Sequence, residues 1–153
     1  MKFIVHTDGG ARGNPGPAAV GVVIETDSRK QIAEFGKRIG ETTNNVAEYN
    51  AVLEGLRNIK YQIANSKYED NNNITIQFYL DSMLVVNQLN GKFKVKDTKL
   101  RELMMQVKIL EGEIGGMISY QYIPREENQR ADFLVNQALD GAVMSSSLSD
   151  LRV

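Results

Sequence analysis

Residues 2–10, Lys2-Phe3-Ile4-Val5-His6-Thr7-Asp8-Gly9-Gly10, are the stretch that decides the fold. The first six are rich in β-branched and aromatic side chains and predict a strand, which Asp8 and the two glycines bring to an end. A carboxylate directly after an apolar strand is costly to bury, because an unpaired interior charge must find a cation or become neutral. Asp8 is therefore the first candidate site residue.

The other elements follow from apolar periodicity and from turn and capping residues. Residues 9–17 hold four Gly and two Pro and predict a loop. Strands are predicted over residues 18–25, 31–39, 74–80 and 117–123, and helices over about 44–65, 82–89, 98–113 and 128–139. Thr43 or Asn44, Asp97 or Thr98, and Asn128 are the expected caps of three helices. Residues 69–73 predict a polar loop.

The order of these elements predicts an α/β fold with one five-stranded mixed sheet. The first three strands can pair antiparallel through short turns, whereas the last two are reached through helices and should run parallel to a neighbour. We expect the first strand beside the fourth, with helices on both faces. Asp81 directly follows the fourth strand, so Asp8 and Asp81 should meet at the carboxyl ends, where open α/β sheets bind ligands.

Glu48 lies where a core residue is expected. It is spaced four, seven and eleven residues from Val52, Gly55 and Ile59, on the apolar stripe of the long helix. A simpler interpretation is that Glu48 complements the helix dipole, which favours an acid near a helix start by ~0.3–1 kcal/mol. Asp132, in the first turn of the last helix, is open to the same interpretation, and its case depends on its joining the other three acids.

Four converging carboxylates with few bases beside them indicate a divalent metal. With no Cys and a single His in the chain, the hard oxygen ligands suit Mg²⁺ or Mn²⁺ rather than Zn²⁺. Two such ions activate water and stabilise the leaving oxygen of a phosphodiester. Gly10, Gly13 and Gly16 also suggest mononucleotide binding, but no Lys-Ser/Thr pair follows them and the next element is a strand. We interpret His6 as a packed strand residue.

Composition bounds the remaining possibilities. The 153 residues suit one domain, which we place at residues 2–140, followed by a polar C-terminal tail at 141–153. The chain has no apolar run of ~20 residues and no apolar N-terminal stretch long enough for a signal peptide, so we expect no membrane span and a cytoplasmic location. A net charge of −1 argues against a general nucleic-acid binder. Residues 92–108, however, carry six basic residues against two acids, which is either a nucleic-acid contact or a solvated helix face.

At its acidic residues the sequence resembles the type 1 ribonuclease H family. The resemblance covers residues 2–139, and the four motifs together are far more specific than any one alone. In chain order they are Thr7-Asp8-Gly9-Gly10 with Gly13-Asn14-Pro15-Gly16-Pro17, Thr43-Asn44-Asn45-x-x-Glu48, Asp81-Ser82, and Asn128-x-x-Ala131-Asp132.

The resemblance implies a ribonuclease H-like fold and a two-metal endonuclease. It implies cleavage of the RNA strand of an RNA·DNA hybrid, which leaves a 5′-phosphate and a 3′-hydroxyl, with two Mg²⁺ or Mn²⁺ ions. The implied catalytic, metal-binding set is Asp8, Glu48, Asp81 and Asp132. The implied substrate contacts are Asn14, Asn44 and Asn45, with Thr43 near a phosphate. Short amide side chains can read the 2′-hydroxyls that distinguish RNA from DNA in a wide minor groove.

The sequence departs from the family pattern at three places. The loop at residues 124–130 has no His, and Arg125 or Glu126 is the expected replacement. Position 83 is Met, where a polar contact is common. A basic protrusion is absent, and residues 93–96, with Lys94 and Lys96, are its only stand-in. We expect Lys94, Lys96 and Arg125 to bind substrate.

Two alternatives to hybrid cleavage stay open. One is an added or different two-metal nuclease activity on double-stranded RNA or RNA–DNA junctions, since the departures alter substrate contacts. The other is a non-catalytic hybrid-binding module, which four intact acids argue against. We expect no obligate protein partner.

Overall fold

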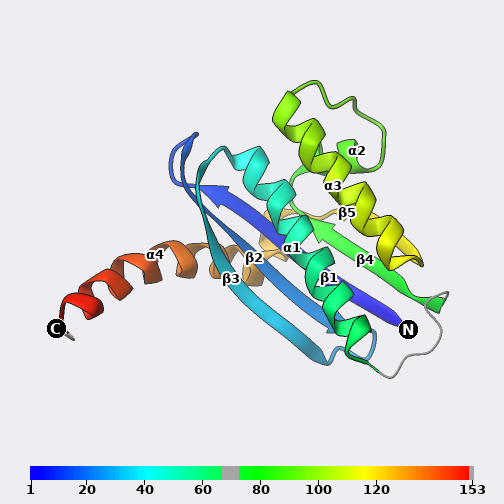
Figure 1. The fold of residues 1–153 in the computed structure, drawn as a ribbon, viewed down its shortest axis with the longest axis horizontal. Coiled ribbons are helices and arrows are strands. Elements are labelled where there is room, and N and C mark those ends of the chain that lie inside the picture. The colour runs from blue at the N-terminus through cyan, green and yellow to red at the C-terminus, as the bar shows by residue number, and fades with distance from the viewer. Residues whose placement is uncertain (67–72, 152–153) are drawn as a thin grey trace.

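Five strands form a single mixed sheet in the computed structural model, which describes residues 1–66 and 73–151, with side chains as far as residue 141 (Figure 1). The elements are β1 (Lys2–Ala11), β2 (Gly16–Thr26), β3 (Gln31–Thr42), α1 (Asn44–Ala64), β4 (Thr75–Leu80), α2 (Met83–Leu89), α3 (Thr98–Ile114), β5 (Met117–Tyr122), the 3-10 turn η2 (Arg125–Glu127) and α4 (Gln129–Leu151). Within the described residues, no helix is both long and apolar enough to cross a membrane.

The strand order is β3-β2-β1-β4-β5, which confirms the predicted topology. β1 pairs antiparallel with β2 and parallel with β4, so that His6 lies between Val23 and Tyr79. β3 pairs antiparallel with β2, and β5 pairs parallel with β4. Helix α1 packs on one face of the sheet, with α3 against it, and α4 crosses the other face over β1, β2 and β3 (Figure 1).

Glycines let both helices approach the sheet closely. A Cβ at Gly9 would lie 2.2 Å from the Ala47 carbonyl of α1, and one at Gly21 would lie 2.2 Å from the Ala131 carbonyl oxygen of α4. Because glycine has no side chain to separate the helix backbone from the strand backbone, α1 and α4 contact the sheet directly at these points. The residues that follow Ala47 and Ala131 in sequence are Glu48 and Asp132, so the glycines bring both acids to the sheet.

The core and the helix starts follow the sequence pattern. Apolar side chains of β1, β4 and α1, among them Val5, Phe78 and Leu56, are fully buried between the sheet and the helices. Thr43 caps α1 by accepting a hydrogen bond from the Val46 amide, and Asp97 caps α3 by accepting one from the Leu100 amide. These interactions confirm the predicted starts of both helices.

The structure corrects three boundaries. β1 does not end at Thr7: Asp8, Gly9 and Gly10 stay in the sheet because β2 starts at Gly16 and pairs with them as far as Ala11. The Gly/Pro loop is therefore short. α4 does not end near Leu139 but continues to Leu151, since no proline interrupts residues 139–151. Of the predicted loop at residues 69–73, residues 69–72 lie outside the described part of the chain.

Candidate active site

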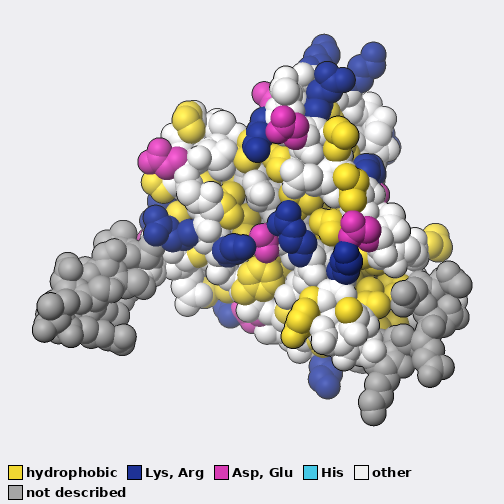
Figure 2. Space-filling model, in the orientation of Figure 1, with side chains coloured by type: hydrophobic (Ala, Val, Ile, Leu, Met, Phe, Trp, Pro, Cys, Tyr) yellow, Lys and Arg dark blue, Asp and Glu magenta, His cyan; other side chains and the backbone are white. Residues whose placement is uncertain are grey.

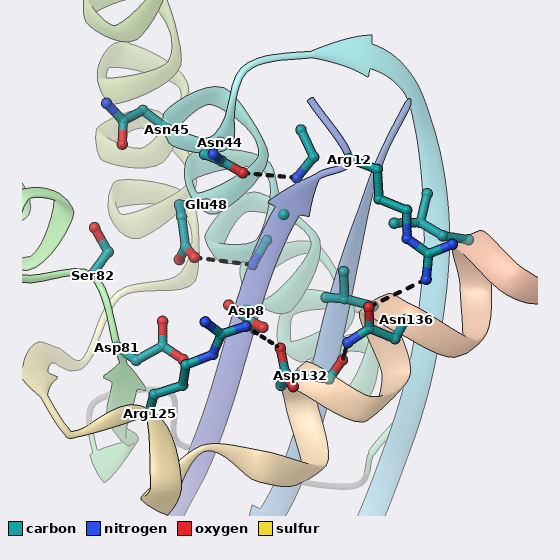
Figure 3. A pocket seen from close by; sticks show the side chains of 15 residues that line it. Asp8, Arg12, Asn44, Asn45, Glu48, Asp81, Ser82, Arg125, Asp132 and Asn136 are labelled. Atoms are coloured by element: carbon teal, nitrogen blue, oxygen red, sulfur yellow. Dashed lines mark hydrogen bonds and ion pairs between the residues drawn. The ribbon is translucent and has the colours of Figure 1, made fainter. Parts of the chain in front are cut away.

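Three carboxylates meet at the edge of the sheet. Asp8 comes from β1, Glu48 from α1 and Asp81 from the end of β4, and one oxygen of each lies within 4.8 Å of the others (Figure 3). Asp8 and Glu48 are each only 6% exposed. The structure thus places Asp8 beside Asp81, as the predicted pairing of β1 with β4 requires.

One oxygen of Glu48 is buried without a partner. Its Oε1 accepts a hydrogen bond from the Gly9 amide at 3.3 Å, whereas Oε2 has no hydrogen-bond partner among the described residues. A buried, unpartnered carboxylate oxygen is destabilising unless something compensates its charge. Helix-dipole complementation does not require this burial, so the geometry fits a bound cation better.

Asp132 reaches the same cavity beside Asp8, just outside the three-oxygen cluster. It lies in the first turn of α4, its side chain is 32% exposed, and its Oδ1 accepts a hydrogen bond from Arg125 Nη2 at 3.3 Å. The structure therefore brings all four predicted acids into one cavity, with three in a tight cluster and Asp132 beside Asp8 and Arg125.

Burial and mutual repulsion perturb the acids. Burial, followed by the charge of Asp81, raises the pKa of Asp8 to about 7. Burial and the charge of Asp8 raise the pKa of Glu48 well above its ordinary value. Burial also raises the pKa of Asp81, although its hydrogen bond from Asn128 acts in the opposite direction. The hydrogen bond to Asp132 raises the pKa of Arg125. Carboxylates arranged this way favour either protons or a divalent cation.

These shifts predict an unusual pH dependence of stability. The folded protein holds protons on Asp8 that the unfolded chain releases, so in EDTA the free energy of unfolding should fall as pH rises from 3.8 to about 7. The contribution of Asp8 should then stay constant above that range. Adding Mg²⁺ or Mn²⁺ at pH 8 should raise the melting temperature by several degrees, and by less at pH 5, where protons compete. Thermal unfolding with and without EDTA tests this prediction. A melting temperature at pH 8 that does not change when either ion is added would contradict it.

The acids lie in an open cavity of about 440 Å³ (Figure 3). Asn44 and Asn45 of α1 form part of its rim, and Arg12 and Asn136 form another part. The full lining is Asp8, Gly9, Gly10, Ala11, Arg12, Asn44, Asn45, Glu48, Asp81, Ser82, Arg125, Asp132, Val135, Asn136 and Leu139.

The predicted amide residues tie the β1–β2 loop to α1. Asn14 Oδ1 accepts a hydrogen bond from the Asn44 amide at 3.0 Å, and Asn44 Oδ1 accepts one from the Ala11 amide at 2.9 Å. Asn44 and Asn45 line the cavity. Asn14 and Thr43 do not line it: Asn14 anchors Asn44 by its hydrogen bond, and Thr43 caps α1. The bond from the Ala11 amide uses the Asn44 carbonyl oxygen, so the Asn44 NH₂ group is the part of that side chain able to donate to a ligand.

Other predicted residues lie elsewhere. Lys94 and Lys96 are exposed between α2 and α3 and are not among the described residues that line the cavity. Lys and Arg side chains project in Figure 2 where Figure 1 shows this loop. His6 stacks on Tyr79 with ring centroids 5.1 Å apart, which confirms it as a packed strand residue. Arg125 lines the cavity and Glu126 does not.

Sequence reasoning missed three residues at the site. The Asn128 side chain does not cap α4; its Nδ2 donates to the Thr7 carbonyl at 2.9 Å and to Asp81 Oδ2 at 3.1 Å, which holds Asp81 against β1. Asn136 lies one turn after Asp132, and that spacing could have indicated a shared helix face. Arg12 lies in the glycine-rich loop, and its positive charge is the only feature of the sequence that could have indicated a role at the site.

The fold and site are those of a ribonuclease H-like domain, and comparisons with known proteins agree. The family model described as "Reverse transcriptase-like" matches residues 6–138. The crystal structure of RNase H1 from Halobacterium salinarum superposes with a TM-score of 0.82 at 35% identity, covering 92% of this chain and 99% of that one. LC11-RNase H1, isolated from compost and solved in complex with an RNA/DNA hybrid, gives 0.84 at 42% identity, covering 92% and 99%.

The chain belongs to this reverse transcriptase-like family and has the type 1 ribonuclease H fold. It is also 38% identical over 149 residues to the bifunctional protein Rv2228c of Mycobacterium tuberculosis, a match that covers 96% of this chain. The chain spans 38% of the length of that relative.

Proposed function

We propose that the chain is a metal-dependent endoribonuclease that hydrolyses the RNA strand of RNA·DNA hybrids and leaves 5′-phosphate and 3′-hydroxyl ends. The observation that carries this proposal is the cluster of Asp8, Glu48 and Asp81, with an unpartnered Glu48 oxygen, in an open cavity rimmed by amides. The hybrid complex of LC11-RNase H1, which is 42% identical, supports the choice of substrate.

The donor set fits Mg²⁺ or Mn²⁺, because these ions favour carboxylate oxygens. Asp8, Glu48 and Asp81 would hold the metal, with Asp132 as the fourth ligand, and we propose two ions during catalysis. When bound, such ions activate water and stabilise charge on the leaving oxygen. The chain fixes two of these carboxylates in advance, Glu48 through the Gly9 amide and Asp81 through Asn128.

Arg125 supplies the positive charge that a histidine in this loop supplies in many members of the family. Its guanidinium lies beside Asp132 in the cavity, and the neighbouring carboxylates hold it in the charged form. Because an arginine does not release its proton in proteins, Arg125 stabilises phosphate charge but does not transfer protons. Arg125 is therefore not the group that protonates the product.

Asn44 and Asn45 supply the contacts that select RNA. Both lie at the rim of the cavity at the start of α1, where their amide groups can donate to a 2′-hydroxyl. Asn14 and Thr43 contribute by holding this rim in place, with Thr43 near a phosphate.

Cleavage of matched substrates tests the proposal. Labelled RNA·DNA hybrid, duplex RNA, RNA–DNA junctions, duplex DNA and each single strand would be incubated with Mg²⁺, Mn²⁺ or EDTA. We expect cuts only in the RNA strand of the hybrid, only with a metal, and 5′-phosphate ends. Cleavage of duplex RNA or of junctions would assign the different nuclease activity, and hybrid binding without cleavage would assign a binding module.

The basic loop provides a separate prediction. Lys94→Ala with Lys96→Ala should weaken hybrid binding and flatten its dependence on salt by up to about 0.9 in log–log slope per lost phosphate contact. Turnover at saturating substrate should change little, because neither lysine lines the cavity. Lys30→Ala with Lys37→Ala, on the β3 side, is the matched control. An unchanged slope in the Lys94/Lys96 variant would make the loop a solvated surface.

A further inference from the structure

We propose that Arg12 binds a phosphate of the nucleic-acid strand that enters the active cavity, and that Asp140 and Asn136 hold its guanidinium ready for that contact. This inference rests on the proposed function and adds to it a substrate-binding residue outside the family motifs. Arg12 lies at the tip of the β1–β2 hairpin and lines the same cavity as the acids (Figure 3).

The backbone at Arg12 is held in a tight loop. Its amide donates to the Pro17 carbonyl at 2.8 Å, across the base of the loop. A Cβ at Gly16 would lie 2.2 Å from the Arg12 carbonyl oxygen, so only glycine permits this close approach. Gly13, which follows directly, has a φ of +104°. The base of the Arg12 side chain is thus fixed relative to β1 and to Asp8.

The guanidinium is fixed at its other end by α4. Arg12 Nη1 lies 2.7 Å from Asp140 Oδ1, and Nη2 donates to Asn136 Oδ1 at 3.3 Å. Asn136 in turn donates from Nδ2 to the Asp132 carbonyl at 3.1 Å. A guanidinium has five N–H donors in a planar fork, and these two contacts leave donors for a further acceptor.

The Arg12–Asp140 ion pair is too exposed to contribute much to the stability of the fold. The side chains of Arg12 and Asp140 are 48% and 63% exposed, and ion pairs at such positions add little to stability. What they do achieve is to restrict a long side chain, which lowers the ordering cost when a ligand arrives.

The positive charge of Arg12 favours an anionic ligand at this part of the cavity rim. Four acids line the cavity, and of the described lining residues only Arg12 and Arg125 are cations. Arg125 is engaged with Asp132 beside the cluster. Arg12 lies across the cavity at the rim, where it would meet a phosphate other than the one at the acids. Its planar fork matches phosphate geometry.

Hybrid binding measured against salt tests the inference with four variants. Arg12→Ala should lower the log–log salt slope by about 0.9, so that between 50 and 200 mM salt its affinity falls about 3.5-fold less than that of the unaltered protein. Arg12→Lys should keep the slope but bind less tightly. Asp140→Asn should keep the slope, because Arg12 keeps its charge, but it should bind less tightly than the unaltered protein, because the guanidinium is no longer held in place. Arg57→Ala is the matched control, since Arg57 is also 48% exposed and ion-paired, at 3.2 Å to Glu54.

The opposing outcomes are distinct. If the ion pair only braces α4, Arg12→Ala and Asp140→Asn will lower the melting temperature equally and neither will change the salt slope, which would overturn the inference. An Arg12→Ala slope equal to that of Arg57→Ala would also overturn it. If the unaltered protein neither binds nor cuts hybrid, the proposed function fails instead. Activity assays in Mg²⁺ should show Arg12→Ala raising KM more than it lowers kcat.

Discussion

Glu48→Gln is expected to lower hybrid cleavage by several orders of magnitude while leaving the metal-free fold at least as stable as before. Gln keeps the shape and can still accept the Gly9 amide bond through Oε1. It removes a buried charge whose second oxygen has no partner among the described residues and which faces Asp8 and Asp81. Metal-ion stabilisation of transition-state charge is worth several kcal/mol, and each 1.36 kcal/mol is about tenfold in rate.

A role limited to the helix dipole gives the opposite pattern. In that case Glu48→Gln would cost ~0.3–1 kcal/mol of stability and cleavage would continue. Glu54→Gln is the matched control, because Glu54 lies in the same helix and is also partly covered, but it pairs with Lys37 and Arg57 outside the cavity. Single-turnover cleavage and denaturant unfolding in EDTA separate the two patterns. Near-normal cleavage by Glu48→Gln in Mg²⁺ would remove Glu48 from the metal site.

Asp8→Asn is expected to abolish cleavage and to stabilise the metal-free protein at pH 8. Burial and the charge of Asp81 raise the pKa of Asp8 to about 7 from 3.8, so keeping it charged at pH 8 costs on the order of 4 kcal/mol. Asn carries no such cost at any pH. The gain should therefore be largest above about pH 7 and should disappear as pH falls toward 3.8.

Thermal unfolding in EDTA across this pH range, beside a cleavage assay, measures both effects of Asp8→Asn. Asp27→Asn, at an exposed turn between β2 and β3, is the control and should change neither quantity. Added Mg²⁺ should stabilise Asp8→Asn less than it stabilises the unaltered protein. A variant that cuts hybrid normally, or that loses stability at pH 8, would contradict the assignment of Asp8 to the carboxylate cluster.

Much of the fold could be predicted because its rules are local or topological. The spacing of apolar residues gave the strands and helices, and Thr43 and Asp97 marked two helix starts. Strands joined through helices had to run parallel, which set β1 beside β4 and so Asp8 beside Asp81. Element ends were less predictable. Gly9 and Gly10 predicted the end of the first strand, but their pairing with β2 keeps them in the sheet.

The sequence by itself determined the order of elements, the strand order and the anomaly of an acid at position 48, because periodicity and connectivity do not depend on distant contacts. Only the tertiary structure decided how closely the carboxylates converge: Asp8, Glu48 and Asp81 form the tight cluster, and Asp132 lies beside Asp8 and pairs with Arg125. It also decided that Asn128 holds Asp81 and that Arg12 meets Asp140. These contacts join residues far apart in the chain, and their distances follow from how closely α1 and α4 pack onto the glycines of β1 and β2.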